Sequence, residues 1–152
     1  MNTDLVCVLD DTLRICKKGK YKKGHKTVSL KLSEKEMKNC KVFLPDELEN
    51  LKSYKNFEHV HIIGRCGYGC ENADSFSVAR NRIELSKLFL HKNDVQEILV
   101  LNLANPVNPG GGARRGARAQ EEDLCRKSSL LLSLEDVSAK SYYCFRNGYR
   151  GG

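Results

Sequence analysis

The sequence predicts an α/β fold with a mostly parallel sheet, and two observations carry this prediction. An apolar strand at 98–103 leads into a glycine-rich loop and then into a helix that begins near Gln120. Earlier in the chain, a strand at 59–63 precedes an amphipathic helix at 72–90, which Asp74 or Ser75 can cap. Together these elements make a βαβα unit, whose right-handed crossover sets the two strands parallel.

The N-terminal third of the chain reads as a separate set of small elements. Apolar residues near helical spacing predict a helix at 4–15, and weak alternation with two glycines predicts a hairpin or loop at 20–31. A short strand at 41–44 and a short helix at 46–54 follow. We therefore expect a boundary between residues 55 and 56, which separates an N-terminal region at 1–55 from a core domain at 56–152.

The loop after the second strand is the strongest chemical feature. Gly110, Gly111 and Gly112 have no Cβ, so their N–H groups can approach a ligand closely, and a helix start just downstream favours an anion such as phosphate. Glu121 and Glu122 stand where that helix begins. Carboxylates beside a bound nucleotide indicate acid–base work on a glycosidic bond.

The order Gly-Gly-Gly, seven residues, Gln-Glu-Glu resembles the signature of the poly(ADP-ribose) glycohydrolases. The wider run NPGGG…GARAQEEDLCR is similar to the microbial-type branch of that family, and the segment at 11–51 resembles the accessory region of the same branch more loosely. The resemblance implies a macrodomain-like, three-layer α/β/α sandwich with a mixed, mostly parallel sheet. A small helical accessory region would precede it.

The resemblance also implies roles for individual residues. Glu122 would be the catalytic acid, Glu121 would orient the ribose, and the loop Gly110–Gly112 would wrap the diphosphate. Asn105 is the nearest match to an asparagine that touches the terminal ribose, and Gln120 joins the substrate-binding group as the first residue of the signature. The implied reaction is hydrolysis of ribose–ribose O-glycosidic bonds, with no cofactor and no metal.

Helical periodicity weighs the two glutamates differently. On one continuous helix from Glu121, the apolar positions form a single face with Glu121 in its middle and Glu122 at its side; these positions are Leu124, Cys125, Leu131 and Leu132. Pattern alone makes Glu121 the buried carboxylate, whereas the resemblance gives the acid role to Glu122. The plain alternative is a flexible glycine turn followed by two glutamates that only complement the helix dipole.

Composition bounds the remaining possibilities. The chain has 152 residues, enough for a single core, and contains no long uncharged apolar segment, so we expect no membrane association. Seven cysteines, an odd number at irregular spacing, read as reduced thiols. With an N-terminus too acidic and too short for a secretory signal, this predicts a cytoplasmic or nuclear protein.

The net charge of +7 is concentrated in a lysine-rich segment at 17–26. Such a run is either a solvated loop or a surface that steers a polyanion. Because poly(ADP-ribose) is itself a polyanion, the charge does not discriminate a glycohydrolase from a nucleic-acid binder. The expected partners are poly(ADP-ribose) or ADP-ribosylated proteins, and we do not expect direct DNA binding.

A second glycine-containing loop, at 64–70, invites a zinc hypothesis. Cys66 and Cys70 with His59 and His61 would supply thiolate and imidazole ligands. Their spacing fits no common zinc pattern, so free thiols in a turn are the competing interpretation. A second phosphate loop is the other alternative.

The C-terminal part departs from the resemblance. Relatives of the microbial-type branch continue beyond this point, with further strands, a second diphosphate loop and an aromatic that covers the adenine. We expect an incomplete site in a chain that is either a fragment or a natural short form. Three hypotheses follow: a glycohydrolase, a non-catalytic ADP-ribose-binding module, and an interaction domain that pairs through an open sheet edge.

Overall fold

The computed structural model describes residues 3–31, 69–89 and 98–136, together with five single residues: Lys41, Phe43, Glu47, Glu49 and Tyr143. The chain divides into two compact units, of which one joins Met1–Lys41 to Glu97–Gly152 and the other is Val42–Gln96. The strand expected at 59–63 lies outside the described residues. The expected boundary between residues 55 and 56 stays a prediction.

The first unit begins with helix α1, Thr3–Lys18, which confirms the helix predicted at 4–15. Asp4 lies in its first turn and Lys17 in its last, so both charges complement the helix dipole. Gly19 ends the helix in the left-handed region, with φ 64°, which a residue with a Cβ rarely adopts. One face of α1 is buried, through Leu9, Leu13 and Cys16.

A lysine-rich hairpin follows α1 and confirms the hairpin interpretation of this segment. Strands β1, Lys20–Lys23, and β2, Lys26–Ser29, pair antiparallel, with Tyr21 opposite Val28. Between them, Gly24 has φ 60°, as the first central position of a type II′ turn requires.

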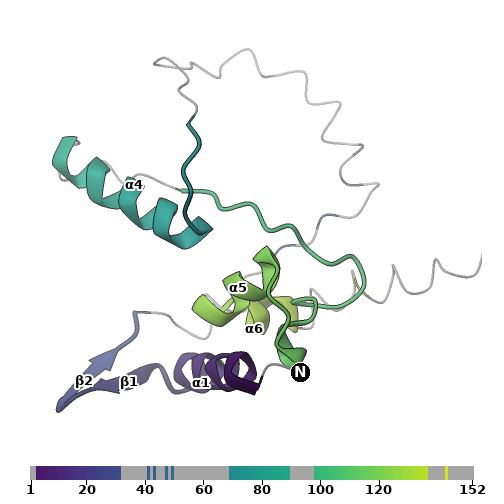
Figure 1. Cartoon of the computed structure of the whole chain (residues 1–152), viewed down its shortest axis with the longest axis horizontal. Coiled ribbons are helices and arrows are strands. Elements are labelled where there is room, and N and C mark those ends of the chain that lie inside the picture. Colours follow the sequence, from purple (N-terminus) through teal and green to yellow (C-terminus); the bar gives the residue numbers. More distant parts are fainter. Residues whose placement is uncertain are drawn as a thin grey trace, which may run out of the picture. The chain divides into compact units, whose positions relative to one another are not determined.

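The core of this unit lies between α1 and the segment that follows the glycine loop. That segment contains the short 3-10 helix η2, Ala113–Arg115, then α5, Gln120–Lys127, and α6, Leu130–Leu134. Helix α1 packs against α5 (Figure 1), and it also contacts η2. The buried cluster contains Leu9, Leu13, Ala113, Cys125 and Leu131. The N-terminal helix thus braces the element that bears the Gln-Glu-Glu sequence.

The prediction of one continuous helix from Gln120 is wrong, because the helix breaks at Ser128. This residue has extended backbone, with φ −149° and ψ −179°. Its hydroxyl donates to the Leu124 carbonyl at 2.8 Å and accepts from the Leu130 N–H at 3.1 Å. A serine side chain that bonds the backbone locally competes with the helical pattern, so the chain turns and restarts as α6.

The strand predicted at 98–103 is also absent, and the described residues contain the β1–β2 hairpin as their one sheet. The mostly parallel sheet is therefore not seen in this part of the chain. Leu99 and Leu101 are 97% and 74% exposed. A strand needs a backbone partner, and its expected neighbour at 59–63 lies outside the described residues; here the polar groups of 101 and 103 bond a side chain of α5 instead.

Helix α4, Ser75–Phe89, belongs to the unit Val42–Gln96 and confirms the helix predicted from this segment. Asp74 caps it, because its Oδ1 accepts the N–H groups of Phe76 and Ser77, both at 3.2 Å. Leu85 and Leu88 of its apolar positions are exposed. Among the described residues, no helix combines the length and the apolar character needed to cross a bilayer.

Candidate functional site

The glycine loop has the backbone conformation that its sequence requires. Gly110 and Gly111 have φ values of 68° and 58°, in the left-handed region. The Gly111 N–H donates to the Asn108 carbonyl at 2.9 Å, and the Ala113 N–H donates to the Gly110 carbonyl at 3.1 Å. Two tight turns therefore deliver the chain into η2.

The loop packs closely against the side chains of α5 and α6, and this close contact explains why its residues are glycines. A Cβ on Gly111 would stand 2.5 Å from Oε1 of Glu122 and 3.1 Å from Oε2 of Glu121. A Cβ on Gly110 would stand 2.6 Å from Cδ1 of Leu131. Glycine thus lets both carboxylates approach the loop backbone.

Both glutamates are buried, Glu121 with 3% and Glu122 with 7% of its surface exposed. The periodicity argument, which would bury Glu121 alone, is therefore wrong. It assumed one continuous helix with one buried face. The glycine loop covers the start of α5 instead, and it contacts both side chains.

The hydrogen bonds of the two carboxylates differ. Glu121 uses both oxygens: Oε1 lies 3.4 Å from the Asn102 amide nitrogen, and Oε2 accepts the Asn105 N–H at 2.7 Å. Glu122 uses one, because Oε1 accepts the Gly112 N–H at 2.8 Å. Its Oε2 is buried and has no hydrogen-bond partner in the described part of the chain.

Gln120 connects α5 to the segment before the loop. Its amide nitrogen donates to the Leu101 carbonyl at 2.7 Å, and its amide oxygen accepts the Leu103 N–H at 2.9 Å. A side-chain amide that bonds one carbonyl and one N–H of the same stretch mimics a strand neighbour. Gln120 therefore fixes the backbone at 101–103, which leads into the glycine loop. Its contact with substrate stays a prediction.

The Asn105 side chain shapes the loop entrance. Its Oδ1 accepts the N–H groups of Val107 and Asn108, at 2.9 and 2.8 Å, in the manner of an Asx turn. The predicted contact of Asn105 with a ribose stays a prediction.

Sequence reasoning missed Asn102, which joins the site through Glu121. Its Oδ1 is buried and has no hydrogen-bond partner within the described ranges. The available signal was one polar residue inside an apolar run. Burial of a polar acceptor without a donor costs about 1–3 kcal/mol, so such an atom in a site is a candidate ligand contact.

Arg126 is a second residue that the sequence did not single out. The side chain is 7% exposed, and its Nη1 donates to the Ala117 carbonyl at 2.6 Å. Its own carbonyl accepts the Thr12 hydroxyl of α1 at 2.6 Å. Arg126 therefore ties the connection after η2 to α5 and ties α5 to the N-terminal helix.

A buried thiol lies beneath the carboxylates. Burial, reinforced by the negative charges of Glu121 and Glu122, raises the pKa of Cys125 to about 12. A thiol that stays protonated at neutral pH is a poor nucleophile, so Cys125 acts as core packing.

The zinc hypothesis rests mainly on residues outside the described ranges. Cys70, an exposed free thiol, is the one predicted ligand that the structure describes. Within those ranges, no three histidine, cysteine or acidic side chains gather around a common point. Zinc binding at 59–70 stays a hypothesis.

Among solved structures, the chain resembles the poly(ADP-ribose) glycohydrolase (PARG) from Thermomonospora curvata. The TM-score is 0.70 with 21% sequence identity, over 98% of this chain and 51% of that chain. The likeness therefore shows a shared fold, and this chain spans about half the length of that enzyme. No curated protein matches the chain.

A known protein family matches most of the chain. The family described as "Microbial-type PARG, catalytic domain" matches residues 10–150. The match includes α1 from residue 10 onward, the glycine loop and the Gln-Glu-Glu sequence, and thus residues on both sides of the core described above. The chain belongs to the microbial-type PARG catalytic-domain family.

Proposed function

We propose that this chain is a poly(ADP-ribose) glycohydrolase that hydrolyses ribose–ribose O-glycosidic bonds in ADP-ribose chains on proteins. Glu122 is the general acid and then the general base in this proposal. Family membership supports the reaction class. The free, buried Oε2 of Glu122 supports the choice between the two glutamates.

Glu122 has an oxygen available for the leaving group, and Glu121 does not. A general acid must present an oxygen within hydrogen-bond reach of the leaving group. Both oxygens of Glu121 already hold the segment at Asn102 and Asn105, so we assign Glu121 a positioning role. Oε2 of Glu122 is a buried oxygen without a partner and is available to carry the proton for the leaving group, and the buried Oδ1 of Asn102 could accept from a ribose hydroxyl.

The reaction then follows in two proton transfers. Glu122 donates its proton to the bridging oxygen as the bond to the anomeric carbon breaks, and positive charge develops on the sugar ring. The released chain leaves with a free ribose hydroxyl. The Glu122 carboxylate then takes a proton from water, which adds to the anomeric carbon and returns Glu122 to its starting state.

The diphosphate would lie against Gly110–Gly112. Two N–H groups of this loop already have partners, since Gly111 donates to Asn108 and Gly112 donates to Glu122. A phosphate that takes the Gly112 N–H would release Oε1 of Glu122. Substrate binding would thereby change the hydrogen bonding of the proposed acid directly.

The test compares three variants of one helical turn. Glu122→Gln should lower ADP-ribose release from labelled polymer by at least about 100-fold, as expected for loss of a general acid. It should keep ADP-ribose binding, measured by calorimetry. Asp123→Asn is the matched control, because Asp123 stands next in the turn and pairs with Lys127 at 2.8 Å on the outside.

Glu121→Gln completes the set. It should weaken ADP-ribose binding as well as release, because its carboxylate holds the Asn102–Asn105 segment. Undiminished release by Glu122→Gln would refute the assignment of the acid. Equal losses in Glu122→Gln and Asp123→Asn would show that only charge matters.

A non-catalytic ADP-ribose-binding module is the second candidate. The span of the chain, about half of the solved enzyme, favours this candidate. Binding of ADP-ribose with no release by the unmodified chain would decide for it. The three-layer sandwich and a cytoplasmic or nuclear location are further parts of the proposal.

A further inference from the structure

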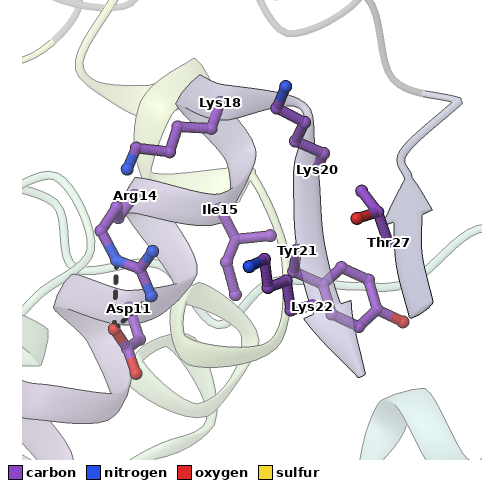
Figure 2. A pocket seen from close by; sticks show the side chains of 8 residues that line it. All are labelled: Asp11, Arg14, Ile15, Lys18, Lys20, Tyr21, Lys22 and Thr27. Atoms are coloured by element: carbon purple, nitrogen blue, oxygen red, sulfur yellow. Dashed lines mark hydrogen bonds and ion pairs between the residues drawn. The ribbon is translucent and has the colours of Figure 1, made fainter. Parts of the chain in front are cut away.

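A basic groove lies between α1 and the hairpin, away from the glycine loop in sequence. Its volume is about 570 Å³, within the range of small-ligand pockets. Figure 2 shows α1 side chains, including Arg14 and Lys18, on one side and those of the hairpin, including Lys20 and Lys22, on the other. The ring of Tyr21 lies on the hairpin side, beyond Lys22 and toward Thr27, in this view.

The groove carries excess positive charge. Four of its side chains are cationic, and the carboxylate of Asp11 pairs with Arg14 at 2.8 Å. Within the described ranges, no ion pair engages Lys18, Lys20 or Lys22. Three lysines around one hollow repel each other, so an anionic ligand would relieve that repulsion.

The positive surface continues toward the proposed site. A second groove, of about 400 Å³, shares Arg14 and Lys18 with the first and is also lined by Lys17 and Arg114. Arg114 lies in η2, two residues after Gly112. The cationic side chains thus form a stripe from the hairpin to Arg114, whose guanidinium also pairs with Glu135 at 2.7 Å. Asp10 is the carboxylate of this second groove.

We propose that this stripe binds the diphosphates of further ADP-ribose units in a polymer whose end occupies the glycine loop. The inference rests on the proposed function, because the polymer is the substrate named there. The stripe leads toward the glycine loop, where the end of the polymer is proposed to bind. This favours an ADP-ribose polymer over a nucleic acid, for which no binding site at the loop is proposed. The aromatic face of Tyr21 offers a stacking surface for an adenine.

The test uses two charge-matched pairs in one hairpin. Lys20→Gln with Lys22→Gln removes two charges from the groove. Lys23→Gln with Lys26→Gln removes two charges from the hairpin end, where these residues face each other and do not line the groove. All measurements are made in the Glu122→Gln background, so that the polymer is not consumed.

The groove pair should weaken binding of a long ADP-ribose polymer about tenfold at 0.15 M salt. It should also reduce the salt slope by about 1.4, at about 0.7 for each lost phosphate contact. Monomeric ADP-ribose should bind as before. The hairpin-end pair should lose less than about twofold on the same scale. Lys18→Gln, which lines both grooves, is a second variant with the same expected direction.

Three outcomes would overturn the inference. One is an equal loss of polymer affinity in both pairs, and another is no loss in the groove pair. The third is an equal, groove-dependent affinity for a single-stranded oligonucleotide with the same number of phosphates. None of these involves release of ADP-ribose, so failure of the groove and failure of the proposed catalysis are distinguishable.

Discussion

Replacement of Gly111 by alanine tests the central packing of the site. The added methyl would stand 2.5 Å from Oε1 of Glu122 and 3.1 Å from Oε2 of Glu121. It would also force a residue with a Cβ into φ 58°. We therefore expect two costs, one from backbone strain and one from displaced carboxylates.

Gly24 separates these two costs. It has nearly the same φ, 60°, but a Cβ there would meet nothing within 4 Å. Gly24→Ala should therefore lower the free energy of unfolding by the strain alone, about 1–3 kcal/mol. Gly111→Ala should lose a further amount of about 1–3 kcal/mol, as is typical of overpacking.

The assay is urea unfolding followed by circular dichroism, with free energies compared at unchanged m-values. A double-mutant cycle with Glu122→Ala isolates the contact, because the second substitution removes the nearest displaced atom. The Gly111→Ala cost should then fall by at least about 1 kcal/mol. A cycle with no coupling, or equal costs at Gly24 and Gly111, would refute this account of the loop.

Three further predictions follow from individual contacts. Thr12→Val removes the hydroxyl that bonds the Arg126 carbonyl at 2.6 Å, and should lower the free energy of unfolding by about 1 kcal/mol in the same urea assay. Asp74→Ala removes the cap of α4 and should cost about 1 kcal/mol locally, seen as faster hydrogen exchange in the first turn of that helix. The pKa of Cys125 is raised to about 12, so between pH 9 and 12 the folded protein keeps a proton on this thiol that the unfolded chain loses. The free energy of unfolding should therefore fall as pH rises from about 9 to about 12. Cys125→Ala should flatten that fall relative to the unmodified chain, and an identical pH slope in both proteins would contradict the burial argument.

Local features were predictable because their causes lie within a few residues. The helix α1, the β1–β2 hairpin and the Asp74 cap each follow from periodicity, turn chemistry or capping. The break at Ser128 was not predicted, although serine often bonds the backbone locally. The break has its cause in two specific hydrogen bonds of the Ser128 hydroxyl, one to a carbonyl and one from an N–H, and the sequence alone does not show them.

The site was predictable as a set of residues and less so as an arrangement. The Gly-Gly-Gly and Gln-Glu-Glu sequences do lie together, with the Gly112 N–H on Glu122. Which glutamate keeps a free oxygen depends on Asn102 and Asn105, which reach Glu121 from a separate segment. Helical spacing contains no information about a loop that covers the helix, so it could not rank the two carboxylates.

The two glutamates therefore differ in their contacts because of what surrounds them and not because of their positions on α5. Glu121 is held at both oxygens, and its removal would free the segment that leads into the loop. Glu122 is held at one oxygen by the same glycine loop that is proposed to bind the diphosphate. A ligand that competes for the Gly112 N–H would change the contacts of Glu122 while those of Glu121 persist. One hydrogen bond, from the Gly112 N–H to Glu122, thus links a ligand in the loop to the contacts of the proposed acid. This link requires a glycine at position 111, where a Cβ would collide with Glu122, and it requires the start of α5 to be buried.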